Sequence, residues 1–420
     1  MIWQSIITDW MSLVFRWLHI VAAIAWIGSS FYFIHLDLSL KPGGGLPDGV
    51  QGGAWQVHGG GFYRIVKYLV APKAMPDELT WFKWEAYTTW LSGIALMIVV
   101  YYLDADLFLI DKSNLDLSPL QAAGFSAGSL VLAWILYDTA CKTALARNEL
   151  QLALGGYLFL VGLTWIFTHV LSGRGALNQI GAIVGTIMVA NVFLVIIPNQ
   201  KKIVAALLVG QLPDPRLGKA SKLRSLHNNY LTLPVVALMM SNHYPLIFAT
   251  RYNWLIVAIL LLLGPVIRHF FNARHAGKKS PWWVWIVAAA GMIAIGWLSA
   301  AGPPGAAVGA LPKVQSKAQP AFAEIEEIVS SRCGMCHASE PVWGSIVTAP
   351  KAVLLDRPEH ILRNAKLIGR FAAWSNAMPP GNVTEMTDQE RASIAAWLAA
   401  GAGGSGSLSA SNPTPLPSPP

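Results

Sequence analysis

The chain has 420 residues, of which 54% are hydrophobic and only 12% are charged, and its mean hydropathy is +0.47. A soluble domain carries about 25% charged residues, so this composition excludes a soluble globular protein and indicates a polytopic membrane protein with a soluble appendage. The net charge of +8 does not indicate nucleic-acid binding, because the basic residues lie in loops between apolar segments. Three cysteines are too few for a disulfide framework.

Eight apolar segments are long enough to cross a hydrocarbon core of about 30 Å as helices. They cover residues 12–36, 81–102, 119–140, 152–171, 176–197, 226–243, 246–270 and 282–300. The sixth is the most interrupted, since it contains the polar run His227–Asn229 and Pro234. The first has no A-x-A cleavage site after it, so we expect it to be a retained span. Residues 38–80 are Gly-rich and semi-polar, which predicts an ordered loop with an interfacial helix at 62–70.

The basic residues divide the loops between these segments into two sets. One set contains sixteen Lys and Arg residues, whereas the other contains three and includes the acidic loop 103–118. The positive-inside rule therefore places the first set in the cytoplasm. Because eight spans bring both termini to one side, we expect both to be periplasmic, in a bacterial inner membrane.

The sequence after the last span predicts three regions. Residues 301–320 are rich in Ala, Gly and Pro and predict a linker, residues 321–402 a small haem domain, and residues 403–420 a disordered tail. Ala321–Arg332 has helical periodicity, and Thr387–Glu390 is a capping box that opens a helix which Gly401 ends. A helix at each end is typical of a class I-like cytochrome c.

The motif Cys333-Gly334-Met335-Cys336-His337 carries the chemistry of this region. C-x-x-C-H is the attachment sequence of c-type haem, in which both thiols bond to the porphyrin and the histidine is the proximal iron ligand. A redox or zinc motif is the alternative, but zinc requires two further ligands nearby. The remaining cysteine, Cys141, lies nearly two hundred residues upstream in an apolar segment.

The distal haem ligand is expected downstream of His337. Met378 is the first choice, because Pro379 and Pro380 stiffen the loop that holds it. Met386 and His360 are the alternative ligands. The alternative role for Met378 itself is that it only fills the core.

Polar side chains within spans are costly and therefore mark candidate functional positions. In the first span, His19, Trp26, Ser30 and Asp37 fall on one helical stripe, which predicts contact with protein, water or a cofactor. The topology places His19, His169 and His243 on the periplasmic side. The polar residues of the cytoplasmic side are His35, His58, Glu85, Asp138, His227, Asn228, Asn229, His269 and His275. A structural role remains the alternative for each histidine.

Several long motifs resemble those of one protein family. They are Trp17–His19 with Ala25–Phe33, Trp55–Tyr63, Leu79–Trp90, His227–Pro234 and Ser241–Pro245. The chain resembles the membrane-bound urate oxidases of bacterial purine catabolism that carry a C-terminal cytochrome c. The resemblance implies an all-α fold, with a bundle of about eight transmembrane helices before a class I-like cytochrome c. It also implies oxidation of urate to 5-hydroxyisourate, with electrons leaving through cytochrome c to the respiratory chain.

A urate site requires amides, a cation and an aromatic face, because urate is a planar purine that is anionic at neutral pH. The candidates for binding are His58, Trp84, His227, Asn228 and Asn229, and those for a catalytic base are Glu85 and Asp138. The sequence does not indicate which of them converge. The expected partners are urate, a periplasmic cytochrome c or terminal oxidase, and membrane lipid, with no nucleic acid.

A non-covalent haem b is also expected within the bundle, because about 30 Å of hydrocarbon separates a cytoplasmic urate site from a periplasmic haem c. His19 is the first-choice ligand, His243 the second and His169 the third. The first span resembles that of small membrane haem-binding proteins, with H-x-x-A-x-x-x-W-x-G starting at His19. The alternative for these histidines is that they only bond neighbouring helices.

The sequence also leaves two alternatives for the function of the chain. It could be a quinol–cytochrome c electron carrier without purine chemistry, or a haem or metal transporter.

Overall fold

The computed structural model describes residues 2–43, 45–300, 320–344 and 346–401. The predicted tail, and all of the predicted linker except residue 320, lie outside these residues. The chain divides into two compact units near residue 301.

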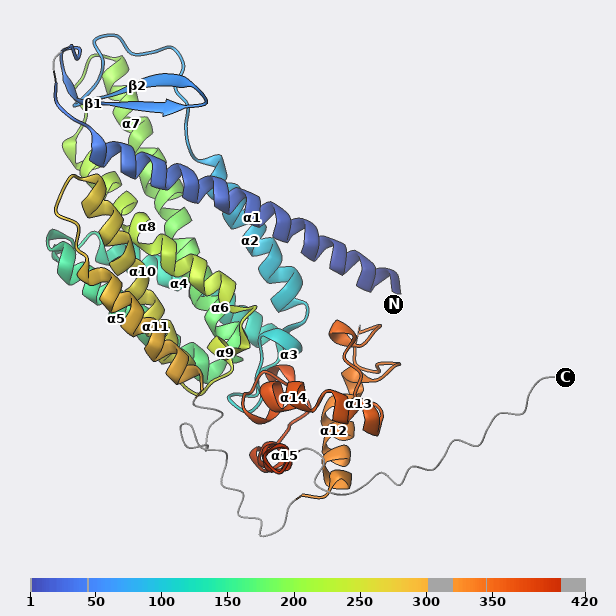
Figure 1. Ribbon diagram of the computed structural model, residues 1–420. Helices are drawn as coiled ribbons and strands as arrows, with labels where there is room; N and C mark the ends of the chain where they lie inside the picture. Colours follow the sequence, from blue (N-terminus) through green and yellow to red (C-terminus); the bar gives the residue numbers. More distant parts are fainter. Residues whose placement is uncertain (1, 44, 301–319, 345, 402–420) are drawn as a thin grey trace. The chain divides into compact units, whose positions relative to one another are not determined.

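The first unit is a bundle of helices (Figure 1). These helices are α1 (Ile2–Ser39), α2 (Trp84–Leu96), α3 (Ala105–Phe108), α4 (Pro119–Ala140), α5 (Glu149–Val170), α6 (Gly173–Ala190), α7 (Ile197–Leu208), α8 (Pro215–Ser241), α9 (Pro245–Phe248), α10 (Asn253–His275) and α11 (Trp283–Ser299). Two π-helical segments, Met97–Tyr102 and Asn191–Ile196, continue α2 and join α6 to α7. Ala144–Arg147 forms a 3₁₀ turn before α5.

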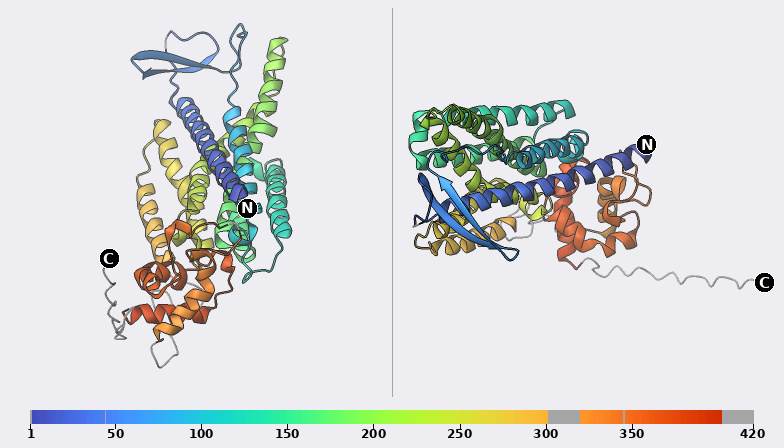
Figure 2. Two further views of the ribbon diagram at one scale, coloured as in Figure 1. Left: turned by 90° about the vertical axis from the view of Figure 1, so that its right-hand side faces the viewer. Right: turned by 90° about the horizontal axis from the view of Figure 1, so that it is seen from above.

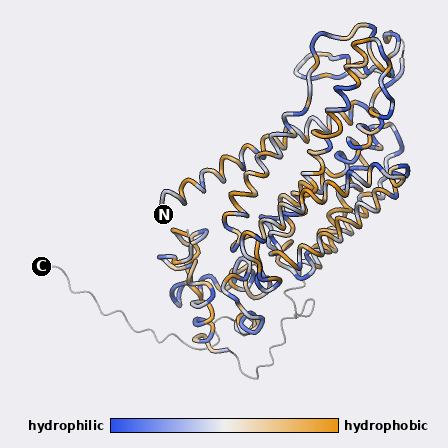
Figure 3. The backbone as a smooth tube through the Cα atoms, turned by 180° about the vertical axis from the view of Figure 1, so that it is seen from behind, coloured by the Kyte–Doolittle hydropathy of each residue, from blue (hydrophilic) through white to orange (hydrophobic). Residues whose placement is uncertain are grey.

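Five helical segments of the described chain are long and apolar enough to span a membrane. They are Ile6–Ser39, Pro119–Ala140, Glu149–Val170, Gly173–Leu208 and Asn253–His275, while α11 is shorter but also apolar. The expectation of a helical multi-pass membrane protein is thus confirmed, and the number of eight spans stays a prediction. Figure 3 shows hydrophobic residues along the helices and hydrophilic ones at the end near residues 41–70.

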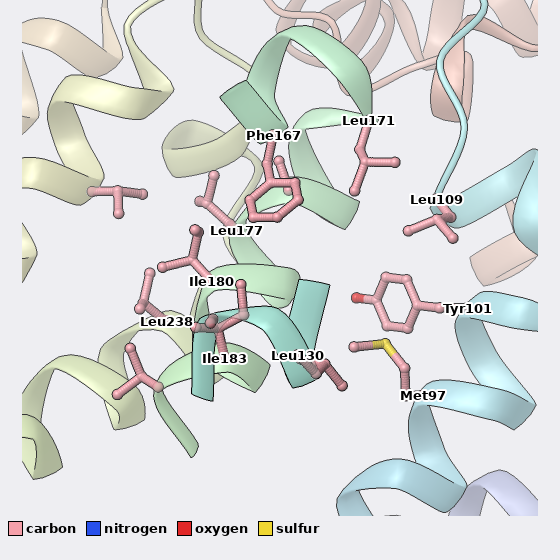
Figure 4. Close-up of a cluster of buried hydrophobic side chains, with 14 of the residues drawn as sticks. Met97, Tyr101, Leu109, Leu130, Phe167, Leu171, Leu177, Ile180, Ile183 and Leu238 are labelled. Carbon is pink, nitrogen blue, oxygen red and sulfur yellow. The ribbon is translucent and has the colours of Figure 1, made fainter. Parts of the chain in front are cut away.

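Helix α6 forms the centre of the bundle. Leu177, Ile180 and Ile183 on α6 are fully buried, and they pack with side chains of α4, α5, α8 and the segment after α2 (Figure 4). A helix that is apolar on most of its faces is stable only when other helices surround it. The polar groups of this core are therefore confined to a few hydrogen-bonded positions.

The interfacial helix expected at 62–70 is wrong. This stretch belongs to an antiparallel hairpin of β1 (Val50–His58) and β2 (Gly61–Tyr68), which lies beyond the C-terminal end of α1, at a level that α7 also reaches (Figures 1 and 2). Gly59 and Gly60 form its turn with φ of 57° and 80°. Two consecutive positive φ angles are what a two-residue hairpin turn of the favoured hand requires, and glycine adopts them without strain.

Two other expected boundaries differ from the structure. Helix α8 begins at Pro215 rather than residue 226, because Asp214 accepts a hydrogen bond from the backbone of Arg216 at 2.8 Å and caps the helix ahead of its apolar part. The seventh segment is split, since a turn before Asn253 separates the short α9 from α10. Hydropathy alone detects neither the polar extension nor the turn.

The second unit contains α12 (Phe322–His337), α13 (Pro358–Arg363), α14 (Ala365–Ile368) and α15 (Asp388–Ala399), with a π-helical segment at Gly369–Ala373. Short 3₁₀ turns cover Pro350–Ala352 and Pro380–Asn382. The expected helix at each end is present. The core of this unit consists mainly of Ile325, Val329, Ile361, Ile394 and Trp397.

The capping box at the start of α15 is confirmed. Thr387 Oγ1 accepts from the backbone N–H of Glu390 at 3.2 Å, and Glu390 Oε2 accepts from the backbone of Thr387 at 2.6 Å. Glu390 Oε1 also accepts from Arg332 Nε on α12 at 2.9 Å. Burial raises the pKa of Glu390, but the hydrogen bonds from Thr387 and Arg332 outweigh it and leave the pKa below its usual value.

Candidate functional site

Three helices of the first unit bring polar side chains together at the end of the bundle that carries the hairpin. Helix α10 contributes Arg268, Asn272 and His275, whose spacing of four and three residues puts them on one helical face. Helix α1 contributes two residues one turn apart, and α8 contributes one. We call the set the Arg268 cluster; its members are Phe31, His35, Asn229, Arg268, Asn272 and His275.

Three close contacts are present within the Arg268 cluster. The guanidinium carbon of Arg268 lies 3.8 Å from the centre of the Phe31 ring, and its Nε donates to Asn229 Oδ1. The rings of His35 and His275 lie edge to face with centres 4.5 Å apart. The exposed fractions of Arg268, Asn229 and Asn272 are 4%, 0% and 8%, so these polar side chains are removed from solvent.

Much of the hydrogen-bonding capacity of this cluster is unused. Five of its buried atoms have no hydrogen-bond partner: Asn229 Nδ2, Arg268 Nη2, Asn272 Oδ1, His35 Nδ1 and His275 Nδ1. In the part of the chain that the structure describes, only Arg174 Nε and Arg251 Nε share this property. Each such atom costs about 1–3 kcal/mol, and more when it is charged. Donors and acceptors left unpaired side by side are typical of a site that binds a polar ligand.

A second polar group, the Arg224 network, links α4, α8 and the segment after α6. Arg224 Nη2 lies 2.7 Å from Asp138 Oδ1, and Arg224 Nη1 donates to Asn191 Oδ1 at 3.2 Å. Asn191 Nδ2 donates to Asn228 Oδ1 at 2.9 Å and to the Tyr137 hydroxyl at 3.0 Å. Each of these groups has a protein partner, whereas five buried atoms of the Arg268 cluster have none.

Three residues predicted to take part in catalysis converge in the Arg224 network. Asp138 pairs with Arg224 and also with Lys142 at 2.5 Å. Asn228 Nδ2 donates to the Met188 carbonyl at 2.9 Å, and His227 Nδ1 lies 2.7 Å from the Tyr137 hydroxyl. Because these side chains already bond protein partners, they fit a structural role, which is the alternative that the sequence left open for His227.

The other predicted binding and catalytic residues are dispersed. His58 is exposed at the hairpin turn, Trp84 is exposed at the start of α2, and Glu85 is half-buried in the first turn of α2. Only Asn229 lies in the Arg268 cluster. Sequence reasoning did not name Arg268 or Asn272 as site residues, although their polar spacing within an apolar helix is a usable signal.

His19 lies against α2. Its Nδ1 is 2.8 Å from the Thr89 carbonyl and 3.3 Å from Ser92 Oγ, and a Cβ at Gly93 would lie 3.0 Å from the imidazole ring. A backbone carbonyl bound at Nδ1 fixes the tautomer that leaves Nε2 available as a metal ligand. The hydrogen-bond partners of His19 in the described residues are Thr89 and Ser92, and neither is a histidine that could be a second haem ligand.

The other two candidate haem b ligands lie at helix ends. His243 is exposed in the turn after α8. His169 is exposed in the last turn of α5, with Nδ1 2.7 Å from the Trp165 carbonyl.

In the second unit, the C-x-x-C-H motif forms the last turn of α12. His337 Nδ1 lies 2.8 Å from the Val353 carbonyl, which is the same arrangement as at His19. Burial raises the pKa of the Cys333 thiol to about 12. Redox-active C-x-x-C pairs instead need a lowered thiol pKa, so this environment does not fit a dithiol catalyst.

The three candidate distal ligands differ in whether their side chains are buried in the core or paired with another side chain, and Met378 is neither. It is half-buried, and its backbone is held by a hydrogen bond to the Phe371 carbonyl at 2.8 Å and one from Arg391 at 2.8 Å. Met386 is buried in the core with 3% exposure. His360 Nδ1 is paired with Asp356 Oδ1 at 2.7 Å, and this hydrogen bond is the main cause that lowers the pKa of Asp356.

Comparison with known proteins identifies the first unit. The family model described as urate oxidase N-terminal matches residues 5–299. No curated protein and no solved structure matched the chain. Membership suggests an oxidoreductase with urate as its substrate, in agreement with the resemblance in the sequence. Since the match covers the whole helical bundle and more than half of the chain, the chain belongs to the urate oxidase N-terminal family.

Proposed function

We propose that this membrane protein oxidises urate to 5-hydroxyisourate and passes the electrons through haem to cytochrome c and the respiratory chain. The observation that carries the proposal is the presence, in one chain, of a urate oxidase family bundle and a C-x-x-C-H motif at the end of α12. Urate and water give 5-hydroxyisourate, two protons and two electrons. The reaction therefore requires an electron acceptor, and a haem domain on the same chain supplies one.

The residues of the second unit fit a covalently attached haem c. Cys333 and Cys336 would form the two thioether bonds, and His337 would be the proximal ligand, with its ring oriented by the Val353 carbonyl. Met378 would be the distal ligand, because Met386 fills the core and His360 pairs with Asp356. When bound, the haem supplies a one-electron relay. The environment of the donor set thus supports residues 321–402 as a cytochrome c domain.

A haem b in the bundle would shorten the electron path. His19 lies sixteen residues before His35 on α1, which is about 24 Å along a helix that rises 1.5 Å per residue. The bond between its Nδ1 and the Thr89 carbonyl supports His19 Nε2 as an iron ligand. His243 is the proposed second ligand, with His169 as the alternative. In this assignment, electrons move from the hairpin end of α1 toward its N-terminal half.

We further propose that both termini face the periplasm, where a periplasmic cytochrome c or a terminal oxidase would accept the electrons. Loop charge supports this orientation. An alkaline phosphatase fused after residue 400 should be active, and a fluorescent protein that matures in the cytoplasm should be bright after residue 215. An inactive phosphatase at 400 would overturn the orientation.

Urate-dependent haem reduction tests the function directly. We expect urate added to anaerobic membranes to produce the reduced α-band of haem c, without release of hydrogen peroxide. Membranes carrying a Cys333→Ala and Cys336→Ala variant are the control, because they should lack the covalent haem. Reduction by quinol but not by urate would refute the proposal and favour an electron carrier without purine chemistry.

A further inference from the structure

We infer that the Arg268 cluster is the binding site of the urate anion. The identity of the ligand rests on the proposed function, whereas its chemical class, a planar anion with both donors and acceptors, follows from the cluster. All members except Asn229 come from α1 and α10, which are far apart in sequence and meet where Arg268 contacts Phe31 and His275 contacts His35. The site would hold the ligand between helices of the bundle, which is a usual place for ligand sites.

Charge is the first argument. Arg268 is 4% exposed, and among the ion pairs of the described residues it takes part in none. A buried charge without a counter-charge is strongly unfavourable, so buried charges in proteins are normally paired. An anionic ligand would supply the missing charge. Urate is such an anion at neutral pH.

The Arg224 network provides the internal comparison. Arg224 is equally buried, with 3% exposure, and its guanidinium also lies over an aromatic ring, 4.8 Å from the centre of Tyr137. However, Asp138 neutralises Arg224, and Asn191 accepts a second hydrogen bond from it. The two arginines thus differ in their counter-charge: an acid pairs with Arg224, and the ion pairs of the described residues include none for Arg268.

Hydrogen bonding is the second argument. Phe31 and Asn229 fix the guanidinium through its face and its Nε, and Nη2 is left as a free donor. Asn229 Nδ2 offers a second donor and Asn272 Oδ1 an acceptor. Urate has ring N–H donors and carbonyl acceptors around its edge. A planar guanidinium is well suited to such an edge, because it donates in a fixed direction and its position is set in advance.

The two histidines complete the site. Nδ1 of His35 and Nδ1 of His275 are unpaired, and an imidazole can donate or accept at this atom. Urate oxidation releases two protons when the oxygen of water bonds to the purine and two electrons leave to haem. His35 and His275 are positioned to accept a proton from urate or from water, and neither shares a hydrogen bond with the Arg224 network.

Arg268→Gln is the decisive variant, because it removes the charge and keeps hydrogen-bonding capacity. We expect the Kd for radiolabelled urate and the KM for urate-dependent haem reduction to rise about 10- to 100-fold, the range for a lost charge-assisted hydrogen bond. Asn272→Leu should raise both constants less. Arg274→Gln is the matched control, since it removes an exposed positive charge from the same helix and should leave both constants unchanged.

The outcomes separate the location of the site from the function. Haem content and dithionite-reduced spectra show whether each variant is folded. If Arg268→Gln does not accumulate in the membrane, Asn272→Leu tests the same site. Wild-type affinity for urate in folded Arg268→Gln or Asn272→Leu, with haem still reduced by urate, would overturn the location alone. Failure of the wild-type protein to bind urate and to reduce its haem with urate would overturn both this inference and the proposed function.

Discussion

The substitution Asp138→Asn distinguishes a structural from a catalytic role for the carboxylate that the sequence suggested as a base. Arg224 Nη2 lies 2.7 Å from Asp138 Oδ1, and the side chains are 4% and 18% exposed. Removing one partner of a buried pair costs roughly 3–5 kcal/mol, because the other charge remains buried without compensation. We expect the lower end of this range, since Asp138 retains some contact with solvent.

Lys142→Gln is the control for this experiment. Lys142 is the other cation on Asp138, but its side chain is 71% exposed. An exposed pair of this kind contributes about 0–1 kcal/mol, so the control should leave stability nearly unchanged. Each variant removes one charge from the same group of ion pairs, and only Asp138→Asn leaves Arg224 without its acid.

Thermal unfolding in lipid nanodiscs, together with urate kinetics, gives the measurement. Asp138→Asn should unfold at a clearly lower temperature, while the KM for urate of the folded fraction stays at the wild-type value. A variant with wild-type stability and a kcat reduced by 100-fold or more would refute our reasoning. Asp138 would then be a base in catalysis rather than the counter-charge of Arg224.

The remaining predictions concern the haem ligands and the second unit. Met378→Ala should abolish the weak near-infrared sulfur-to-iron band and lower the reduction potential, whereas survival of the band there and its loss in Met386→Ala would show that Met386 is the ligand. His19→Ala should remove acid-extractable haem b from the full-length protein and leave the covalent haem c unchanged; full haem b content would exclude His19. Because hydrogen bonds hold the pKa of Glu390 below its usual value, its contribution to stability is present at neutral pH and is lost as the pH falls through the lowered pKa. Glu390→Gln should therefore flatten the acid side of the stability curve of the second unit, and an unchanged curve would contradict this linkage.

The positions of the apolar helices could be predicted from the sequence, because each depends on local hydropathy. The capping box at Thr387–Glu390 also depends only on residues close in sequence, and its prediction is confirmed. The hairpin was missed, although Gly59 and Gly60 are a strong turn signal. Phe62 and Tyr63 are adjacent on β2 and both are exposed, so the apolar–polar alternation that identifies a half-buried strand is absent from this part of the hairpin.

The candidate site was harder to predict because it depends on which helix faces meet. Arg224 and Arg268 belong to the sixteen Lys and Arg residues that the sequence assigned to cytoplasmic loops, yet both are buried within helices. Asn228 and Asn229 are adjacent in sequence, but they point to different neighbours: Asn228 to Asn191 and Asn229 to Arg268. One residue along a helix changes direction by about 100°, and only the packing of helices decides which direction leads to the ligand.

The π-helical segment Asn191–Ile196 has a consequence for sequence changes in this family. A π-turn contains one residue more than an α-turn of the same helix, so it works as a local insertion. Pro198 lies in the first turn of α7 and cannot donate a backbone hydrogen bond, which favours this irregular turn. The extra residue sets the rotation of α7 independently of the rotation of α6. Deletion of one residue here would restore a continuous α-helix and rotate every later position of α7 by about 100°, a change that no single substitution could reverse.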